Sequence, residues 1–333
     1  MLDLGPLLFE PRLVPKIWGG RRLEAWGKKL PPALAIGESW ELYDDAQGSP
    51  QCCQGPLLGR SLAELGALWG RSFYGPVQRH SDEPFPLLVK LLDAQEDLSV
   101  QVHPSDDLAR SLHGPGAKGK MEMWVVLEAA PGARVLNGFK SGVTWNKVRE
   151  AVAETDPLAV ANLLNSISVR AGDVIDVPAG RPHAIGAGCL VAEVQQNSDW
   201  TYRLWDYGRL EQGRPRALHL KEAEKALRFD AVGMADGRVL PRVRQEPWGR
   251  REPLISNAFF KVERWTLKPG AGVDVGGSLR ALMALSGTLG LNTITGVPPA
   301  RIMPGQTALV PAALSLRLEG ASTETVLLSI EAV

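Results

Sequence analysis

Four side chains that commonly bind metal ions come from three separated stretches of the chain. Gln101 and His103 lie two residues apart in an extended run, so their side chains leave the same face of a strand. Glu122 lies in a second such run, and His183 follows a turn rich in Pro and Gly. One amide oxygen, two imidazoles and one carboxylate suit a divalent ion that accepts nitrogen and oxygen, with zinc as the first candidate.

Spacing alone does not establish this site. A single histidine at a strand end more often bonds to the backbone, and Gln101 is compatible with a solvent-facing strand position. Glu122 lies between two methionines, and a carboxylate buried among apolar neighbours is costly unless it is paired or binds a metal. This cost favours a ligand. Three further histidines show no partner pattern and are assigned no role: His80, His113 and His219.

Short runs of apolar and β-branched residues predict the strands that carry these groups. They are bounded by Gly, Pro or Asp and cover residues 85–92, 98–103, 122–127 and 189–194. Helical patterns are fewer. Ser61 and Glu64 form the signature of a capping box, a small helical insertion is expected near residues 141–168, and residues 220–228 have apolar residues at helical spacing.

A short pattern occurs twice, at residues 172–179 and 305–312. Each copy consists of Gly, five residues, Pro and Ala, which predicts a turn followed by a strand that stops at the proline. The repeat indicates a duplicated β-module. The second copy has Leu316 where the first has His183, so we expect the second half to supply structure and the first to supply chemistry.

The repeat divides the chain into two expected domains. Residues 1–235 form the catalytic domain with its helical insertion, and residues 236–333 form a second, metal-free domain. Residues 230–250 are rich in Gly, Pro and Arg, which is typical of a linker. The second domain contains no histidine.

Composition excludes several classes of protein. Lys and Arg total 37 and so do Asp and Glu, so the formal net charge is zero and nothing favours a nucleic acid or an acidic membrane as partner. No apolar run approaches the roughly 18 residues of a membrane span, and the first residues do not read as a signal peptide. We therefore expect a cytoplasmic protein. The three cysteines form no disulfide framework: Cys52, Cys53 and Cys189.

Seven motifs, in order along the chain, resemble those of the type I phosphomannose isomerases of the cupin superfamily. They cover residues 16–20, 36–42, 90–94, 98–104, 119–124, 177–184 and 193–203. The resemblance extends from about residue 10 to residue 230 and is looser beyond. Met121 and Trp200 stand where the family often has Thr, and Trp205-Asp206-Tyr207 exchanges the two aromatic residues of the usual motif.

The resemblance implies a mainly β fold of two cupin-type jelly rolls, or double-stranded β-helices, with a small helical insertion. It implies one zinc ion per chain, held by Gln101, His103, Glu122 and His183. It also implies a metal-dependent aldose–ketose isomerase that interconverts mannose 6-phosphate and fructose 6-phosphate through an enediol or enediolate. The expected partner is thus a small sugar phosphate, and the expected assembly is a monomer or a weak homodimer.

Moving a proton between C1 and C2 of the sugar requires a proton carrier. We expect Glu193 to be the acid–base residue with Lys120 assisting, although the residues alone leave an exchange of these roles open. Arg203 stays protonated and is expected to stabilise charge. Ser99 and Lys90 match family positions near the phosphate. Trp18 is expected to form a wall of the sugar site.

Two other functions are compatible with part of this pattern. Two histidines and one glutamate also describe the facial triad of non-haem iron oxygenases, but Gln101 occupies a position that oxygen chemistry would leave open. A non-catalytic, sugar-binding or regulatory cupin is the second alternative. It has no need for Lys120, Glu193 and Arg203 beside the ligands.

Overall fold

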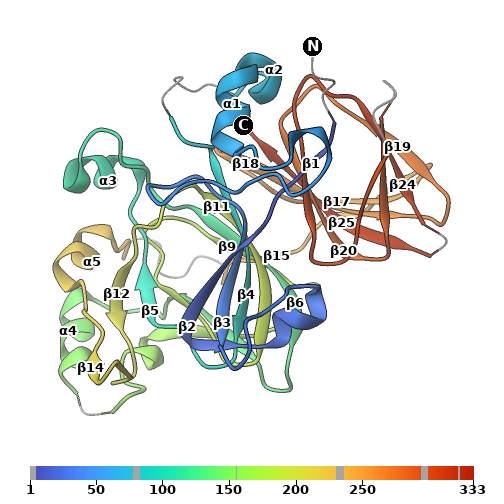
Figure 1. Cartoon of the computed structure of the whole chain (residues 1–333). Helices are drawn as coiled ribbons and strands as arrows, with labels where there is room; N and C mark the ends of the chain where they lie inside the picture. The colour runs from blue at the N-terminus through green and yellow to red at the C-terminus, as the bar shows by residue number, and fades with distance from the viewer. Residues whose placement is uncertain (1–4, 78–82, 155, 230–235, 294–298, 322) are drawn as a thin grey trace.

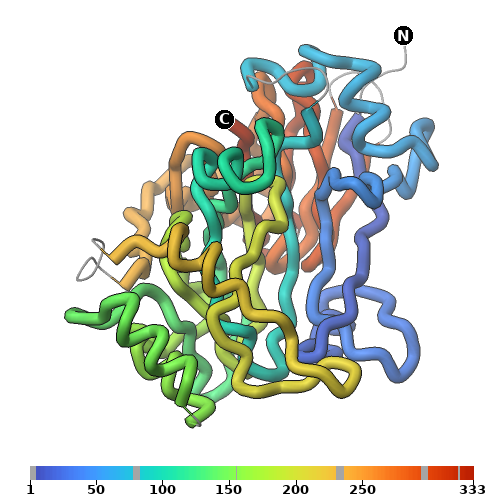
Figure 2. The backbone as a smooth tube through the Cα atoms, turned by 90° about the vertical axis from the view of Figure 1, so that its left-hand side faces the viewer, coloured from blue at the N-terminus to red at the C-terminus, as the bar shows by residue number. Residues whose placement is uncertain are grey.

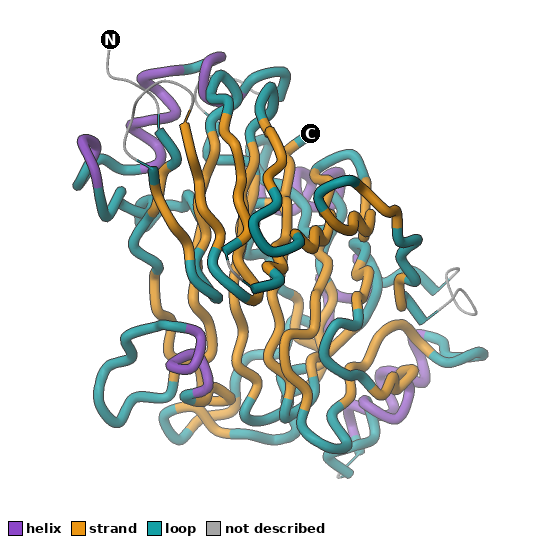
Figure 3. Tube along the Cα trace, turned by 90° about the vertical axis from the view of Figure 1, so that its right-hand side faces the viewer, coloured by secondary structure: helices purple, strands orange, loops and turns teal. Residues whose placement is uncertain are grey.

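The chain folds into two β-modules that pack against each other, as the computed structural model shows (Figure 1). The structure describes residues 5–77, 83–154, 156–229, 236–293, 299–321 and 323–333. Strands dominate both modules, and helices lie at the periphery (Figure 3). Among the described residues, no helix combines the length and the apolar composition that crossing a membrane requires.

The first module consists of two antiparallel sheets in the described part of the chain. The larger has seven strands in the order β15 (Arg238–Val239), β9 (Val174–Val177), β6 (Glu122–Ala129), β11 (Cys189–Gln196), β4 (Leu87–Ala94), β3 (Ile36–Leu42) and β2 (Arg12–Gly20). The smaller has five strands in the order β12 (Tyr202–Trp205), β5 (Val100–Val102), β10 (His183–Ile185), β7 (Arg134–Phe139) and β8 (Leu164–Ser168). A separate hairpin joins β13 (Leu210–Glu211) and β14 (Arg214–Pro215).

The second module repeats this arrangement within the described ranges. Its larger sheet has the order β1 (Leu7–Leu8), β23 (Thr307–Val310), β20 (Arg280–Ser286), β25 (Thr325–Ala332), β18 (Phe260–Leu267), β17 (Gly249–Ser256) and β16 (Arg244–Glu246). Its smaller sheet has the order β19 (Gly272–Val275), β24 (Leu316–Gly320), β21 (Leu289–Thr293) and β22 (Ala300–Ile302).

The order of strands confirms the duplication. The run β9-β6-β11-β4-β3 in the first module corresponds to β23-β20-β25-β18-β17 in the second, and β5-β10-β7-β8 corresponds to β19-β24-β21-β22. Gly172 and Gly305 both adopt positive φ angles, 92° and 83°, in the turns before β9 and β23. Both strands end immediately before a proline, as the repeated pattern predicts.

Helices cover the ends and the outer faces of the sheets. They are α1 (Leu62–Trp69), α2 (Arg71–Tyr74), α3 (Asp106–His113), α4 (Trp145–Ala153) and α5 (Leu220–Ala226), with short 3-10 turns at Arg22–Trp26, Gly55–Leu57 and Ala161–Leu163. Buried residues of α4 and α5, such as Val148 and Ala223, share a core cluster with Val100 of β5, so both helices pack on the five-stranded sheet (Figure 2). The capping box at α1 is formed as predicted, with Ser61 and Glu64 bonding to each other's backbone N–H.

One local prediction is wrong. Residues 164–168, expected within the helical insertion, form strand β8, because their backbone pairs with β7. The described part of the expected linker at 230–250 contributes one strand to each module, because β15 pairs with β9 of the first module and β16 with β17 of the second. In addition, β1 near the amino terminus pairs with β23, which adds the start of the chain to the sheet of the second module.

The two large sheets pack face to face around the largest core. This core contains Val125 of β6 and Ala192 of β11 together with Met283 of β20 and Leu328 of β25, all at most 1% exposed. Side chains alternate along a strand, so the opposite face of β6 and β11 is available for other residues. The second module therefore covers the back of the sheet whose front carries polar side chains.

Deleting residues 236–333 is expected to abolish folding, because it exposes the apolar face shared by the two large sheets. The soluble fraction of the expressed fragment 1–235 and its cooperative unfolding in urea would measure this. A milder test of the same core is the substitution Leu328→Ala, which truncates a fully buried side chain. It is expected to lower the free energy of unfolding by roughly 2–5 kcal/mol. A soluble fragment 1–235 that unfolds cooperatively would contradict the prediction.

Candidate active site

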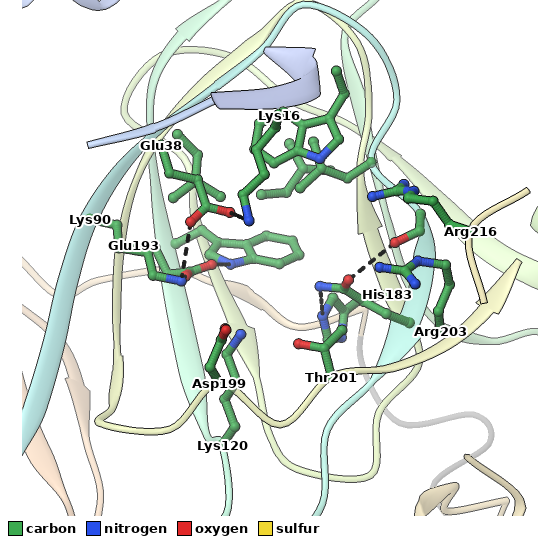
Figure 4. A pocket seen from close by; sticks show the side chains of 17 residues that line it. Lys16, Glu38, Lys90, Lys120, His183, Glu193, Asp199, Thr201, Arg203 and Arg216 are labelled. Carbon is green, nitrogen blue, oxygen red and sulfur yellow. Dashed lines mark hydrogen bonds and ion pairs between the residues drawn. The ribbon is translucent and has the colours of Figure 1, made fainter. Parts of the chain in front are cut away.

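A cavity of about 280 Å³ opens between the two sheets of the first module (Figure 4). Its polar wall comes from both sheets and from the segment between β11 and β12. The polar side chains that line it are Lys16, Glu38, Lys90, Ser99, Gln101, Lys120, His183, Glu193, Asp199, Thr201, Arg203 and Arg216. Trp18, Trp124 and three aliphatic residues complete the wall.

The alternation of side chains along strands places these polar groups. On β6, Met123 and Val125 join the core between the modules, whereas Trp124 points to the cavity and Glu122 shares its side of the strand. On β11, Glu193 faces the cavity between two core residues of the opposite face. The same strands that build the core therefore present the chemistry on their other side.

Three of the four predicted metal ligands form one buried cluster. The ligand atoms of His103, Glu122 and His183 all lie within 4.8 Å of one another. The Nε2 atom of His103 is 3.4 Å from Glu122 Oε2, and the Nε2 atom of His183 is 3.3 Å from Glu122 Oε1. Each of the three residues is about 1% exposed.

The fourth predicted ligand, Gln101, is placed by strand register. Gln101 of β5 pairs directly with His183 of β10, and its Nε2 atom is 3.3 Å from His183 Nε2. The hydroxyl of Ser99 donates to the amide oxygen of Gln101 at 3.3 Å. Gln101 of β5, Glu122 of β6 and His183 of β10 are thus brought together with His103, which directly follows β5, and the atom of Gln101 that faces His183 is its amide nitrogen.

Hydrogen bonds fix which nitrogen of each imidazole is free. The Nδ1 atom of His103 is 2.9 Å from the carbonyl oxygen of Trp200, and the Nδ1 atom of His183 is 2.9 Å from that of Arg181. A carbonyl only accepts, so Nδ1 carries the proton and Nε2 keeps its lone pair. Burial lowers the pKa of His183 to about 3 and holds the pKa of His103 below its usual range, so both rings are neutral.

The cluster has the properties of a cation site. Burial opposes ionisation of Glu122, but its interactions with the neighbouring His103 and Lys120 hold its pKa below the usual range. His103 Nε2 and both carboxylate oxygens of Glu122 are buried without a hydrogen-bond partner. Buried acceptors without partners are costly, and a divalent cation would satisfy all three. The donors fit zinc, which takes neutral imidazole nitrogen and carboxylate oxygen.

A second group of charges surrounds Glu193. The indole of Trp124 donates to Glu193 Oε2 at 3.0 Å, and Lys90 Nζ is 3.4 Å from Oε1. Burial and the charge of Glu122 raise the pKa of Glu193 to about 7. A carboxyl group with such a pKa exchanges protons readily near neutral pH.

Lys90 lies between two carboxylates. Its Nζ atom is 3.7 Å from Glu38 Oε2 as well as close to Glu193. Burial opposes its charge, but these two carboxylates raise the pKa of Lys90 above its usual range. Lys16 contacts the other oxygen of Glu38 at 3.3 Å. Positive and negative groups therefore alternate along this side of the cavity (Figure 4).

Two arginines line the opposite side of the cavity (Figure 4). Arg216 is paired with Asp206, and Arg203 donates to the carbonyl oxygen of Ala217 at 2.9 Å. The Nε atom of Arg203 is buried and has no hydrogen-bond partner. Burial and the neighbouring Arg216 lower the pKa of Arg203, although a guanidinium stays protonated at neutral pH. The side of the cavity lined by Arg203 and Arg216 therefore favours the binding of an anionic group.

The sequence patterns anticipated most of the cavity but not all of it. Eight of the ten predicted site residues line it, and His103 and Glu122 complete the cluster beside it. Lys16, Glu38, Asp199 and Thr201 also line it and lie inside the quoted motifs, so the signal was present. Arg216 could not be predicted from the sequence, because it lies in a stretch without a motif or a periodic pattern.

His113 and His219 lie outside the His/Glu/His cluster. His219 accepts from the backbone N–H of Arg203 at 3.2 Å just before α5. His113 stacks on Trp200. His80 lies outside the described residues.

The donors of the cluster are not repeated in the second module. The strand register relates His183 and Gln101 to Leu316 and Val275. It also relates Glu122 to Arg280, because both pair with the valine that precedes the proline of the repeat. One module thus carries the potential ligands, and its counterpart carries two apolar side chains and a cation at these positions.

A buried His/Glu/His cluster inside one of two duplicated antiparallel β-modules defines a double jelly-roll protein of the cupin type. Residues 8–122 match the family model for the catalytic domain of type I phosphomannose isomerase. The probable mannose-6-phosphate isomerase GmuF of Bacillus subtilis is 36% identical over 264 residues, which cover 79% of this chain and 80% of that protein. The mannose-6-phosphate isomerase of Streptococcus mutans is also 36% identical, with 79% of each chain covered.

Solved structures agree with these relatives. The crystal structure of mannose 6-phosphate isomerase from Bacillus subtilis superposes with a TM-score of 0.86 at 27% sequence identity, covering 98% of this chain and 99% of that one. The chain therefore belongs to the type I phosphomannose isomerase family, and the resemblance of its seven motifs is confirmed.

Proposed function

We propose that this chain is a metal-dependent aldose–ketose isomerase that interconverts mannose 6-phosphate and fructose 6-phosphate through an enediol or enediolate. The observation that carries the proposal is the buried cluster of His103, Glu122 and His183 next to a cavity that also holds Glu193 and Lys120. The names of the relatives support the choice of substrate. We expect the enzyme to be cytoplasmic and to be a monomer or a weak homodimer.

Gln101, His103, Glu122 and His183 are proposed to hold one Zn²⁺ per chain. Three neutral donors and one carboxylate leave a formal charge of 2 − 1 = +1 on the site. When bound, the ion supplies positive charge that stabilises the negative charge developing on the sugar oxygens. The hydrogen bonds from the two Nδ1 atoms to the carbonyl oxygens of Trp200 and Arg181 keep both imidazoles turned toward the site.

Glu193 is proposed to move the proton. Its carboxylate takes the proton from C2 of the open-chain aldose, the C–H electron pair forms the C1–C2 double bond, and the carbonyl pair moves onto O1 to give the enediolate. A proton then passes from O2 to O1, the C2–O2 double bond forms, and the resulting carboxylic acid returns its proton to C1. Lys120 assists at the sugar oxygens, and Arg203 stabilises charge. Ser99 and Lys90 are proposed for the phosphate and Trp18 for the wall of the sugar site.

A coupled assay of the purified protein with mannose 6-phosphate tests this function. We expect turnover that falls to background after dialysis against a chelator and returns when Zn²⁺ is added, whereas glucose 6-phosphate serves as the control substrate and is not converted. Stoichiometric metal without turnover would contradict the isomerase and favour a sugar-binding cupin. Oxygen consumption that depends on iron would favour an oxygenase.

A further inference from the structure

The last residue of α3 packs on the segment that leads to the cavity. The ring of His113 lies flat on that of Trp200, with ring centroids 3.5 Å apart and an angle of 2° between the planes. Its Nε2 atom is 2.8 Å from the hydroxyl of Tyr202. His113 therefore contacts the residues on both sides of Thr201, which lines the cavity. Trp200 is one of the positions where this chain departs from the family motif.

The backbone of Trp200 reaches the metal cluster. Its carbonyl oxygen accepts the hydrogen bond from His103 Nδ1 at 2.9 Å. Its neighbours Asp199 and Thr201 line the cavity, whereas the side chain of Trp200 does not, so the indole is directed away from the cavity. This agrees with the 40% exposure of Trp200.

The chain is anchored on both sides of Trp200: the hydroxyl of Ser198 donates to the carbonyl oxygen of Lys118 at 2.9 Å, and Tyr202 pairs with Val102 of β5. Residues 197–201 join β11 to β12 without regular secondary structure, so no ladder of backbone hydrogen bonds fixes this position. The backbone N–H of Trp200 makes a long bond of 3.5 Å to the hydroxyl of Ser198. Between these anchors, the position of the carbonyl depends on what holds the indole, and the stacked partner of the indole is His113.

We propose that His113 is a positioning residue of the metal site. It stacks on Trp200 and bonds to Tyr202, and thereby fixes the carbonyl that sets the tautomer and the orientation of His103. Helix α3 makes this support stiff, because it begins at the Ser105 N-cap, two residues after His103, and ends at His113. The inference rests on the proposed binding of metal by His103. It does not depend on which sugar the enzyme converts.

The rate of zinc release to a chromophoric chelator from the full-length, zinc-loaded protein tests this role. Because loss of a group that orients a metal ligand weakens binding by about 10–100-fold, we expect His113→Ala to release zinc roughly tenfold faster than the wild type. His113→Phe keeps an aromatic ring on Trp200 and is expected to restore slow release. The matched control on the same helix is Arg110→Ala, whose side chain is exposed and pairs only with Asp106 and Asp107 in the described structure. It is expected to leave the rate unchanged.

Hydrogen exchange of the metal-free protein, followed by mass spectrometry, provides a second measurement. We expect His113→Ala to increase exchange in residues 197–202 while β4 stays protected. Unchanged exchange in that segment would overturn the positioning role. Increased exchange with unchanged zinc release would overturn the coupling to His103. If the wild type binds no zinc, the proposed metal site fails, and the exchange result still decides whether His113 holds the segment.

Discussion

Replacing His103 with alanine is expected to abolish both stoichiometric zinc binding and isomerase turnover. The substitution removes one of two imidazoles of the cluster and leaves the buried Oε2 atom of Glu122 without that neighbour. Because losing only a group that orients a ligand costs about 10–100-fold in metal affinity or activity, loss of the ligand itself should lower kcat/KM by more than about 100-fold. Metal content by mass spectrometry and the coupled assay measure the two effects.

The matched control for this substitution is His219→Ala. His219 lies beside Arg203, outside the cluster, so the variant is expected to retain one zinc per chain. Comparing the two variants separates loss of a ligand from the general effect of removing a histidine. Full metal content in His103→Ala would remove His103 from the site, and with it the arrangement of ligands on β5, β6 and β10.

The parts of the fold that were predictable from the sequence have local causes. The strands β4, β6 and β11 are revealed by short runs of apolar residues, and helix α1 by its capping box. The errors arise where pairing with a strand distant in the sequence determines the local structure. Residues 164–168 were assigned to the helical insertion, but pairing with β7 makes them a strand. The pairing of β1 with β23 joins residues about 300 positions apart, and no local pattern reveals it.

The candidate site follows the same rule. Gln101 lies on β5 and His103 directly follows it, so their spacing indicated a common face. The assignment of Glu122 and His183 to the site rested on the recognised motifs. Arg216 enters the cavity because the chain reverses its direction between β12 and α5. The residues next to Arg216 in the sequence show no pattern that predicts this position. The pKa values of the site residues could not be predicted from the sequence either. The pKa of Glu193 depends on burial and on Glu122, and both are consequences of how β6 and β11 pair.

Replacing Glu193 with glutamine is expected to keep the zinc but remove most of the turnover. The amide has nearly the shape of the carboxylate and lies outside the His/Glu/His cluster, so metal content should stay at one per chain. It cannot accept the proton from C2, and loss of a positioned acid–base group typically costs about 10²–10⁴-fold in rate. The coupled assay and the exchange of the C2 hydrogen with solvent deuterium measure the loss of the proton transfer directly.

The pH dependence decides whether Glu193 or Lys120 carries the proton. A base must be deprotonated to act, and burial with the charge of Glu122 raises the pKa of Glu193 from its ordinary value of 4.5. In the wild type, kcat/KM should therefore rise with pH through a pKa well above 4.5, and this limb should be missing from the residual activity of Glu193→Gln. The comparison variant is Lys120→Met, which should lower the rate but keep the limb. Near-normal turnover in Glu193→Gln, with the limb lost only in Lys120→Met, would assign the proton to Lys120, whose Nζ atom lies 3.7 Å from Glu122.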